Sequence, residues 1–199
     1  MALIDLTRSD AKIDAIAASL DDLPEAQRLD QLFSLTAQDQ ARLYEKAADA
    51  PPLDLDFFVP SDIADERPVI HYGKNSQPAF RNFEKRWARP NDRPGELWGY
   101  NETRVRPLIG PGYFVARRTD DDGSDPRGAV VVDYFQVPPA DASIADWPPV
   151  RPNSKGLQKF VYNKTRDYMR RVSGFCSIGV AYRLESRVMG YFVLCRERL

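Results

Sequence analysis

The spacing of the hydrophobic residues changes near residue 67. Before this point they recur at intervals of three and four, as on one face of a helix. After it they mostly alternate with polar residues or form short apolar runs, as β-strands do. The pattern predicts a helical part, 1–66, and a β-rich part, 67–199, which we expect to fold as one unit.

Three short helices are predicted at the N-terminal end of the chain. Ser9 or Asp10 is typical of a helix start, Pro24 suits the first turn of a second helix, and Thr36 with Asp39 matches a capping box. The third helix should reach about Ala48. Their apolar positions are Ile13, Ile16, Ala17, Leu20, Leu29, Leu32, Phe33, Leu43, Tyr44 and Ala47. These faces are narrow, so we expect the helices to cover the β part rather than form a core of their own.

A proline- and aspartate-rich stretch, 51–68, separates the two parts. Its apolar segment Phe57-Phe58-Val59 is expected to hold it against the body of the protein. The β part then begins at Val69. Segment 79–89 is ambiguous, because its aromatic residues fit either a strand or a short helix packed across a barrel end.

Three consecutive strands are predicted at 95–102, 112–119 and 128–137, each opened by glycine and rich in aromatic or β-branched residues. Segments 176–184 and 188–195 form the clearest predicted hairpin. Between the third of these strands and the hairpin, segment 138–153 is a proline-rich belt and segment 154–173 is partly helical in its spacing. The predicted class is α+β, mainly β: an antiparallel barrel, or a strongly curved sheet folded over a helix, with N-terminal helices as a cover.

The predicted hairpin indicates how the two cysteines are placed relative to each other. If its turn centres on Glu185-Ser186, Cys176 and Cys195 face each other across adjacent strands. In a reducing cytosol we expect them to be free, half-buried thiols.

Part of the C-terminal region resembles a known group. The residues concerned are Asp167-Tyr168-Met169-Arg170-Arg171-Val172, Ile178-Gly179 and the strand Tyr191–Arg196. This segment is similar to the C-terminal segment of small lipocalin-like barrel proteins of unassigned function, the group named for a Gly-x-Trp-x-Gly motif. Gly95-Glu96-Leu97-Trp98-Gly99 has one residue more than that motif before the tryptophan. The resemblance implies an antiparallel barrel able to hold one small apolar ligand.

Composition and charge narrow the function classes. No apolar run approaches the roughly 18 residues of a membrane span, and the N-terminus does not have the pattern of a secretory signal, so a cytoplasmic protein is expected. Residues 1–66 carry 5 basic and 15 acidic residues, and 67–199 carry 23 basic and 14 acidic ones. The basic residues alternate with carboxylates, which favours an acidic helical layer docked on a basic body over a nucleic-acid surface. The sequence does not indicate an oligomeric state.

Metal and cofactor sites are not predicted. The acidic loop 119–125 does not match the EF-hand pattern and is interpreted as a solvated hairpin tip. One histidine and two distant cysteines do not give the ligand spacing of a zinc site. The chain contains no phosphate-binding loop or dinucleotide fingerprint, so no cofactor is expected.

The candidate binding residues combine aromatic area with polar groups, a composition that suits a pocket wall as well as a plain core. Asp133 is the anomaly, since it lies within an apolar strand. If it pointed inward it would need a partner such as Arg171 or Tyr100. The candidates are His71, Tyr72, Trp98, Tyr100, Tyr113, Asp133, Tyr134 and Arg171.

Three functions remain open. The first is binding of a small apolar or aromatic molecule in a barrel pocket. The second is an enzyme on the same scaffold that uses Asp133 and His71 as acid and base groups. The third is an interaction protein whose basic face, Arg81–Arg118, meets an acidic partner or nucleic acid.

Overall fold

The computed structural model describes residues 1–78, 80–120, 122–142, 144 and 146–199. Ala79, Asp121, Ser143 and Ala145 lie outside the described residues. They belong to the ambiguous segment 79–89, to the acidic loop and to the proline-rich belt, so those predictions are assessed on the remaining residues.

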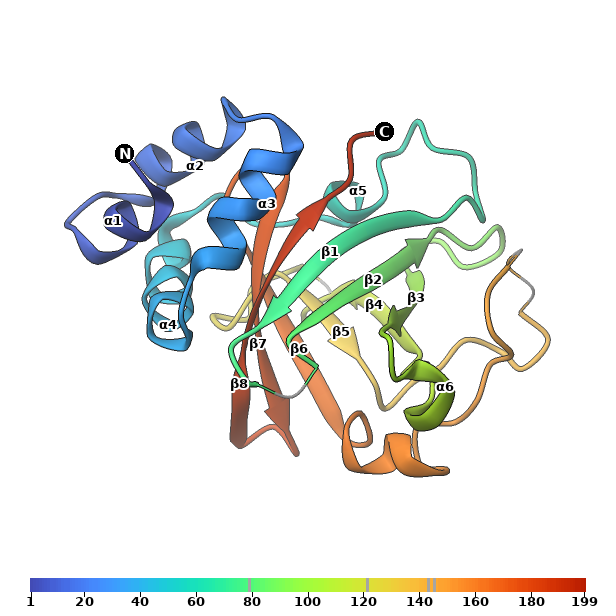
Figure 1. Ribbon diagram of the computed structural model, residues 1–199. Helices are drawn as coiled ribbons and strands as arrows, with labels where there is room; N and C mark the ends of the chain where they lie inside the picture. The colour runs from blue at the N-terminus through green and yellow to red at the C-terminus, as the bar shows by residue number, and fades with distance from the viewer. Residues whose placement is uncertain (79, 121, 143, 145) are drawn as a thin grey trace.

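Eight antiparallel strands form a closed barrel, in which each strand pairs with the next and β8 returns to β1 (Figure 1). Closure decides between the two predicted architectures, since each of the eight described strands has a neighbour on both sides. The strands are β1 (Val69–Asn75), β2 (Asn82–Ala88), β3 (Leu97–Glu102), β4 (Phe114–Arg118), β5 (Val130–Asp133), β6 (Thr165–Arg171), β7 (Cys176–Arg183) and β8 (Arg187–Arg196).

Short helices accompany the barrel. They are α1 (Leu3–Arg8), α2 (Ile13–Asp21), α3 (Glu25–Ser34), α4 (Ala37–Lys46), α5 (Leu55–Phe58) and α6 (Arg106–Ile109), with 3-10 turns η1 (Ala47–Asp49) and η2 (Leu157–Phe160). The sequence did not predict α1. The described part of 79–89 contains a strand, and 154–173 forms η2 and strand β6 rather than a helix. Among the described residues, the helices are too short to cross a membrane.

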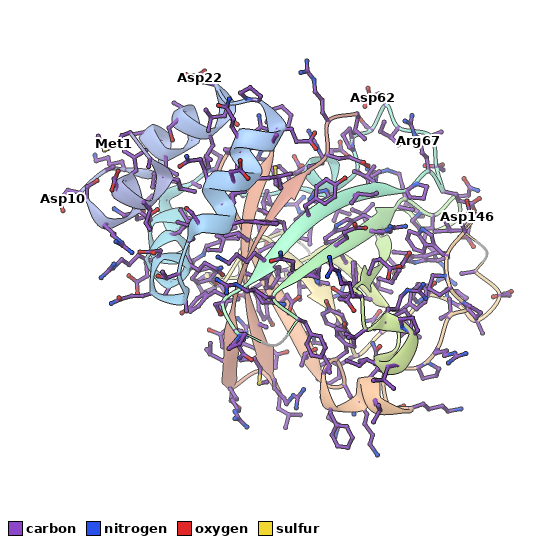
Figure 2. The ribbon with its side chains drawn as sticks, in the orientation of Figure 1. Met1, Asp10, Asp22, Asp62, Arg67 and Asp146 are labelled. Carbon is purple, nitrogen blue, oxygen red and sulfur yellow. The ribbon has the colours of Figure 1, made fainter. Side chains whose placement is uncertain are left out.

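Helices α1 to α4 cover one side of the barrel, as predicted. Apolar residues of the helices, including Ile16, Leu32 and Leu43, pack in one cluster with the outward-facing Ile178 and Val180 of β7. Figure 2 shows Asp10 and Asp22 on the far side of this layer, pointing away from the barrel. The layer therefore buries its apolar face against the strands and leaves acidic residues in water.

The last hairpin aligns the cysteines as predicted. Cys176 lies directly opposite Cys195, and an irregularity at Ala181/Tyr182 compensates for a turn that is centred one half-residue earlier than expected. Both cysteines are free and fully buried beneath the helical cover, more deeply than the half-buried thiols expected.

Helix α5 closes one end of the barrel. Phe58 is fully buried, and its ring stacks on Trp87 with centroids 4.6 Å apart. Asp54 caps this short helix by accepting a hydrogen bond from the Phe57 N–H, at 2.8 Å. The segment Phe57-Phe58-Val59 thus holds the proline-rich stretch to the body, as the sequence predicted, by filling the barrel interior.

Candidate functional site

A cavity of about 230 Å³ occupies the end of the barrel opposite α5. Its outer rim includes Gln77 and Phe160, both exposed, so the cavity reaches the surface. Rings from β2, β8 and the segment before β6 form its walls. Phe83 meets Phe192 edge to face with centroids 5.9 Å apart, and Tyr162 stacks on Tyr134 at 5.4 Å.

A glycine provides the space for one of these rings. Gly179 faces the barrel interior from β7, and a Cβ at this position would overlap the ring of Phe192. The close approach places Phe192 in the cavity wall.

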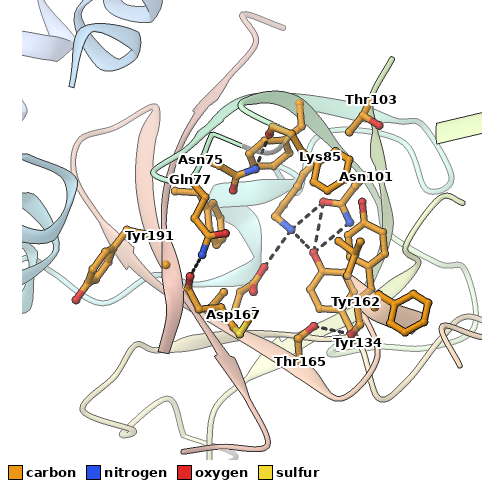
Figure 3. A pocket seen from close by; sticks show the side chains of 18 residues that line it. Asn75, Gln77, Lys85, Asn101, Thr103, Tyr134, Tyr162, Thr165, Asp167 and Tyr191 are labelled. Carbon is orange, nitrogen blue, oxygen red and sulfur yellow. Dashed lines mark hydrogen bonds and ion pairs between the residues drawn. The ribbon is translucent and has the colours of Figure 1, made fainter. Parts of the chain in front are cut away.

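Four polar side chains meet at the floor of the cavity: Lys85, Asn101, Tyr134 and Asp167 (Figure 3). Lys85 Nζ donates to Asn101 Oδ1 at 3.1 Å, to Asp167 Oδ2 at 3.2 Å and to the Tyr134 hydroxyl. Asn101 Nδ2 donates to the carbonyl of Gly112 at 2.9 Å. The ammonium therefore has an acceptor for each of its three protons.

Strand alternation places these groups inside. Lys85 lies between the inward-facing Phe83 and Trp87 of β2, and the register sets it directly opposite Asn101 on β3. Asp167 comes from β6, on another part of the barrel wall, next to the inward-facing Met169 position. Closure of the sheet brings the amine and the carboxylate together.

Burial governs the charges of this cluster. The Lys85 and Asp167 side chains are only 2% and 7% exposed. Loss of hydration lowers the pKa of Lys85, and the nearby Asp167 carboxylate opposes this shift. Loss of hydration likewise raises the pKa of Asp167, opposed by Lys85. Burial thus favours the neutral form of each group, whereas the contact between the two groups favours their charged forms.

Of the eight predicted binding residues, all among those described, only Tyr134 lines this cavity. Trp98, Tyr100 and Tyr113 lie on the outer side of the barrel, where the proline-rich belt covers them. The ring centroid of Trp147, which belongs to the belt, lies 5.1 Å from that of Tyr100 and 6.2 Å from that of Tyr113. Tyr72 lies on the outer face of β1, opposite Glu84 and Cys195 of its two neighbouring strands.

His71 and Arg171 lie at the closed end of the barrel. His71 is fully buried, with Nε2 3.0 Å from the carbonyl oxygen of Phe58. The Arg171 guanidinium lies 5.0 Å from the ring centroid of Phe57. Neither residue lines the cavity at the other end.

Asp133 faces outward. It alternates with Val132 and Tyr134, which belong to the interior cluster, and its carboxylate accepts from Arg166 Nε at 2.9 Å. Its second cationic neighbour is Arg117, at 3.5 Å. The suggested partners Arg171 and Tyr100 are therefore replaced by Arg166 and Arg117. The barrel wall separates Asp133 from His71, so the structure does not assemble the acid–base pair considered above.

Four of the eight arginines from Arg81 to Arg118 contact carboxylates. Arg86 contacts Glu84 at 2.8 Å, Arg106 contacts Glu102 at 2.8 Å, and Arg89 contacts Asp56 at 2.7 Å. Such pairs reduce the positive potential that an acidic partner or nucleic acid would meet.

Sequence reasoning missed Lys85, Asn101 and Asp167. A signal for Lys85 was present, because it lies between two aromatic residues at alternate positions, where a strand points inward. Asp167 was noted only within the segment that resembles the barrel group. No group of metal-ligating side chains that could hold an ion occurs within 1–78, 80–120, 122–142, 144 and 146–199.

No protein family model, curated protein or solved structure matches this chain. Fold and site define the protein as a closed, eight-stranded antiparallel barrel with an aromatic-walled cavity at one end and a buried lysine–aspartate pair at its floor.

Proposed function

We propose that this protein binds a small apolar or aromatic molecule in the cavity above Lys85, as a lipocalin-like binding barrel. The observation that carries the proposal is the combination of aromatic walls with a compact polar cluster at the floor. Binding sites for small molecules typically pair apolar walls with a few convergent polar groups.

The size of the cavity limits the ligand. An engineered apolar cavity of about 150 Å³ holds benzene. A cavity of about 230 Å³ suits one aromatic ring with a short substituent. A polar atom on that substituent would lie toward Lys85 and Tyr134, while the ring would lie between Phe83 and Phe192. The resemblance of the C-terminal segment supports the same proposal, since Asp167 and Phe192, which line the cavity, belong to it.

Thermal unfolding in the presence of single-ring aromatic compounds tests this function. A ligand at about 100 times its Kd should stabilise the protein by about 2.7 kcal/mol, which corresponds to a rise in Tm of about 5–10 °C. Native mass spectrometry of freshly purified protein would detect a small molecule that co-purifies.

A matched pair of variants locates the binding. Ala181 lines the cavity, so Ala181→Phe should fill it and abolish the ligand-dependent rise in Tm. Val188 lies on the same hairpin but is 46% exposed, so Val188→Phe should leave the rise unchanged. An unligated native mass together with no stabilisation by any compound would contradict the proposal, as would equal responses of the two variants.

A further inference from the structure

Lys85 presents a primary amine at the floor of the cavity. The chain contains seven lysines, and Lys85 is the one that lines this cavity. Its side chain reaches the floor from β2, with Nζ beside the Asp167 carboxylate and the Tyr134 hydroxyl (Figure 3). A buried lysine beside a proton-accepting group is the usual arrangement for a nucleophilic amine.

We propose that Lys85 forms an imine with a small aldehyde or ketone held in the cavity, an inference that rests on the proposed ligand-binding function. An imine forms from an amine and a carbonyl carbon. The ligand would therefore be an aldehyde or ketone that carries about one aromatic ring.

Asp167 can carry each proton that this reaction moves. It first takes the proton of the Lys85 ammonium, over the 3.2 Å contact, and leaves a neutral amine. The amine nitrogen attacks the carbonyl carbon, and Asp167 returns the proton to the carbonyl oxygen. Asp167 then removes one proton from the nitrogen and delivers it to the new hydroxyl. The C–O bond breaks, water leaves, and the nitrogen lone pair forms the C=N bond of a protonated imine beside the Asp167 carboxylate.

The surroundings suit that cationic product. Lys85 Nζ lies 4.9 Å from the ring centroid of Phe114, 5.0 Å from that of Tyr134 and 5.1 Å from that of Phe192. Aromatic faces stabilise a positive charge at such distances. The rings and Asp167 therefore stabilise the iminium as they stabilise the ammonium, and the cluster keeps the same net charge from reactants to product.

Lys74 provides an internal comparison. It is also buried, and loss of hydration lowers its pKa as well. Its Nζ, however, donates to the carbonyls of Phe33 and Leu35, so it faces the helical cover rather than the cavity. Burial is common to both lysines, whereas access from the cavity belongs to Lys85.

Reductive trapping tests the proposal on the full-length protein. The protein is incubated near neutral pH with benzaldehyde and sodium cyanoborohydride, and the labelled lysine is located by peptide mass spectrometry. Lys85 should be labelled at least about tenfold faster than the exposed Lys155, because the cavity holds the aldehyde beside the Lys85 amine at an effective concentration far above that in solution. Lys74 should stay unlabelled. Benzyl alcohol, which fits the same space but lacks a carbonyl, should slow the labelling of Lys85 and leave that of Lys155 unchanged.

The possible results of these experiments distinguish imine formation at Lys85 from ligand binding alone. Stabilisation by benzyl alcohol without trapped Lys85 would overturn the imine and retain the binding function. No stabilisation and no trapping would overturn both. Labelling of Lys85 and Lys155 at equal rates would also contradict the imine. Lys85→Met combined with Asp167→Asn removes the amine without leaving a lone buried charge, and this variant should lose the fast label. Val188→Phe, at an exposed position outside the cavity, should keep both the fast label and the stabilisation by benzyl alcohol.

Discussion

His71 shows how position inside the barrel sets the properties of a residue. Its imidazole lies at the closed end, beside the stacked rings of Phe58 and Trp87, with centroid distances of 5.6 Å to each. Burial lowers the pKa of His71 to about 3, against an ordinary value of 6.5. The Nε2 atom faces the Phe58 carbonyl, so the neutral ring carries its proton there.

This shift predicts a pH dependence of stability. Between pH 6.5 and pH 3 the unfolded chain binds a proton at His71 that the folded protein does not, so stability falls as the pH decreases. At pH 4.5 the loss from this group should be about 2–3 kcal/mol relative to pH 7.5. Urea unfolding of the wild type and of His71→Leu at both pH values measures it. The variant should lose less stability on acidification by this amount, and equal losses in the two proteins would contradict the prediction.

The residue scale also explains where the structure places the predicted site residues. Asp133 was recognised as an unusual acid, but its side chain faces Arg166 outside the barrel. Lys85 and Asp167 were missed, although each lies at an inward position. Neighbouring positions on a strand point to opposite faces, so residue type alone does not show which member of a pair such as Asp133 and Tyr134 faces the cavity.

At the scale of the element, helix α4 shows whether the capping box predicted from Thr36 and Asp39 forms. The predicted capping box is present: the Thr36 hydroxyl accepts from the Asp39 N–H at 3.3 Å, and the Asp39 carboxylate accepts from the Thr36 N–H at 3.1 Å. Asp39 also accepts from Arg8 at 2.8 Å, which ties α4 to α1. The nearby guanidinium holds the pKa of Asp39 well below its usual range.

Two substitutions should therefore differ in cost. Thr36→Ala removes one cap interaction and should lower the free energy of unfolding by about 0.5–2 kcal/mol. Asp39→Asn weakens both the cap and the link to α1, so its cost should be larger. Ser34→Ala, at an exposed position of α3, should change stability by less than about 0.5 kcal/mol. Urea unfolding measures all three, and a cost for Thr36→Ala no greater than that of the control would contradict the assignment.

Other elements could not be assigned from local pattern. Segment 154–173 has partly helical spacing, yet Thr165–Arg171 forms a strand. It pairs on both sides, with β5 and with β7. Backbone pairing with those two neighbouring strands overrides the weak helical preference of the local sequence.

At the scale of the whole molecule, the helical cover and the barrel share one hydrophobic cluster. We therefore predict one cooperative unfolding transition for parts 1–66 and 67–199. Trp87, Trp98 and Trp147 all belong to the barrel part, whereas α1 to α4 belong to the cover. Tryptophan fluorescence and helical circular dichroism should give the same urea midpoint. Two separate midpoints would show that the cover and the barrel unfold independently.

Local chemistry was sufficient for features whose parts lie close in the chain. The capping box, the alternation of the strands and the Cys176–Cys195 hairpin each depend on neighbouring residues, and each could be predicted from the sequence. The closure of β8 on β1 and the meeting of Lys85 with Asp167 join distant segments. Only the tertiary structure decided these features, because the side of the barrel on which a residue lies depends on the register of every strand between them.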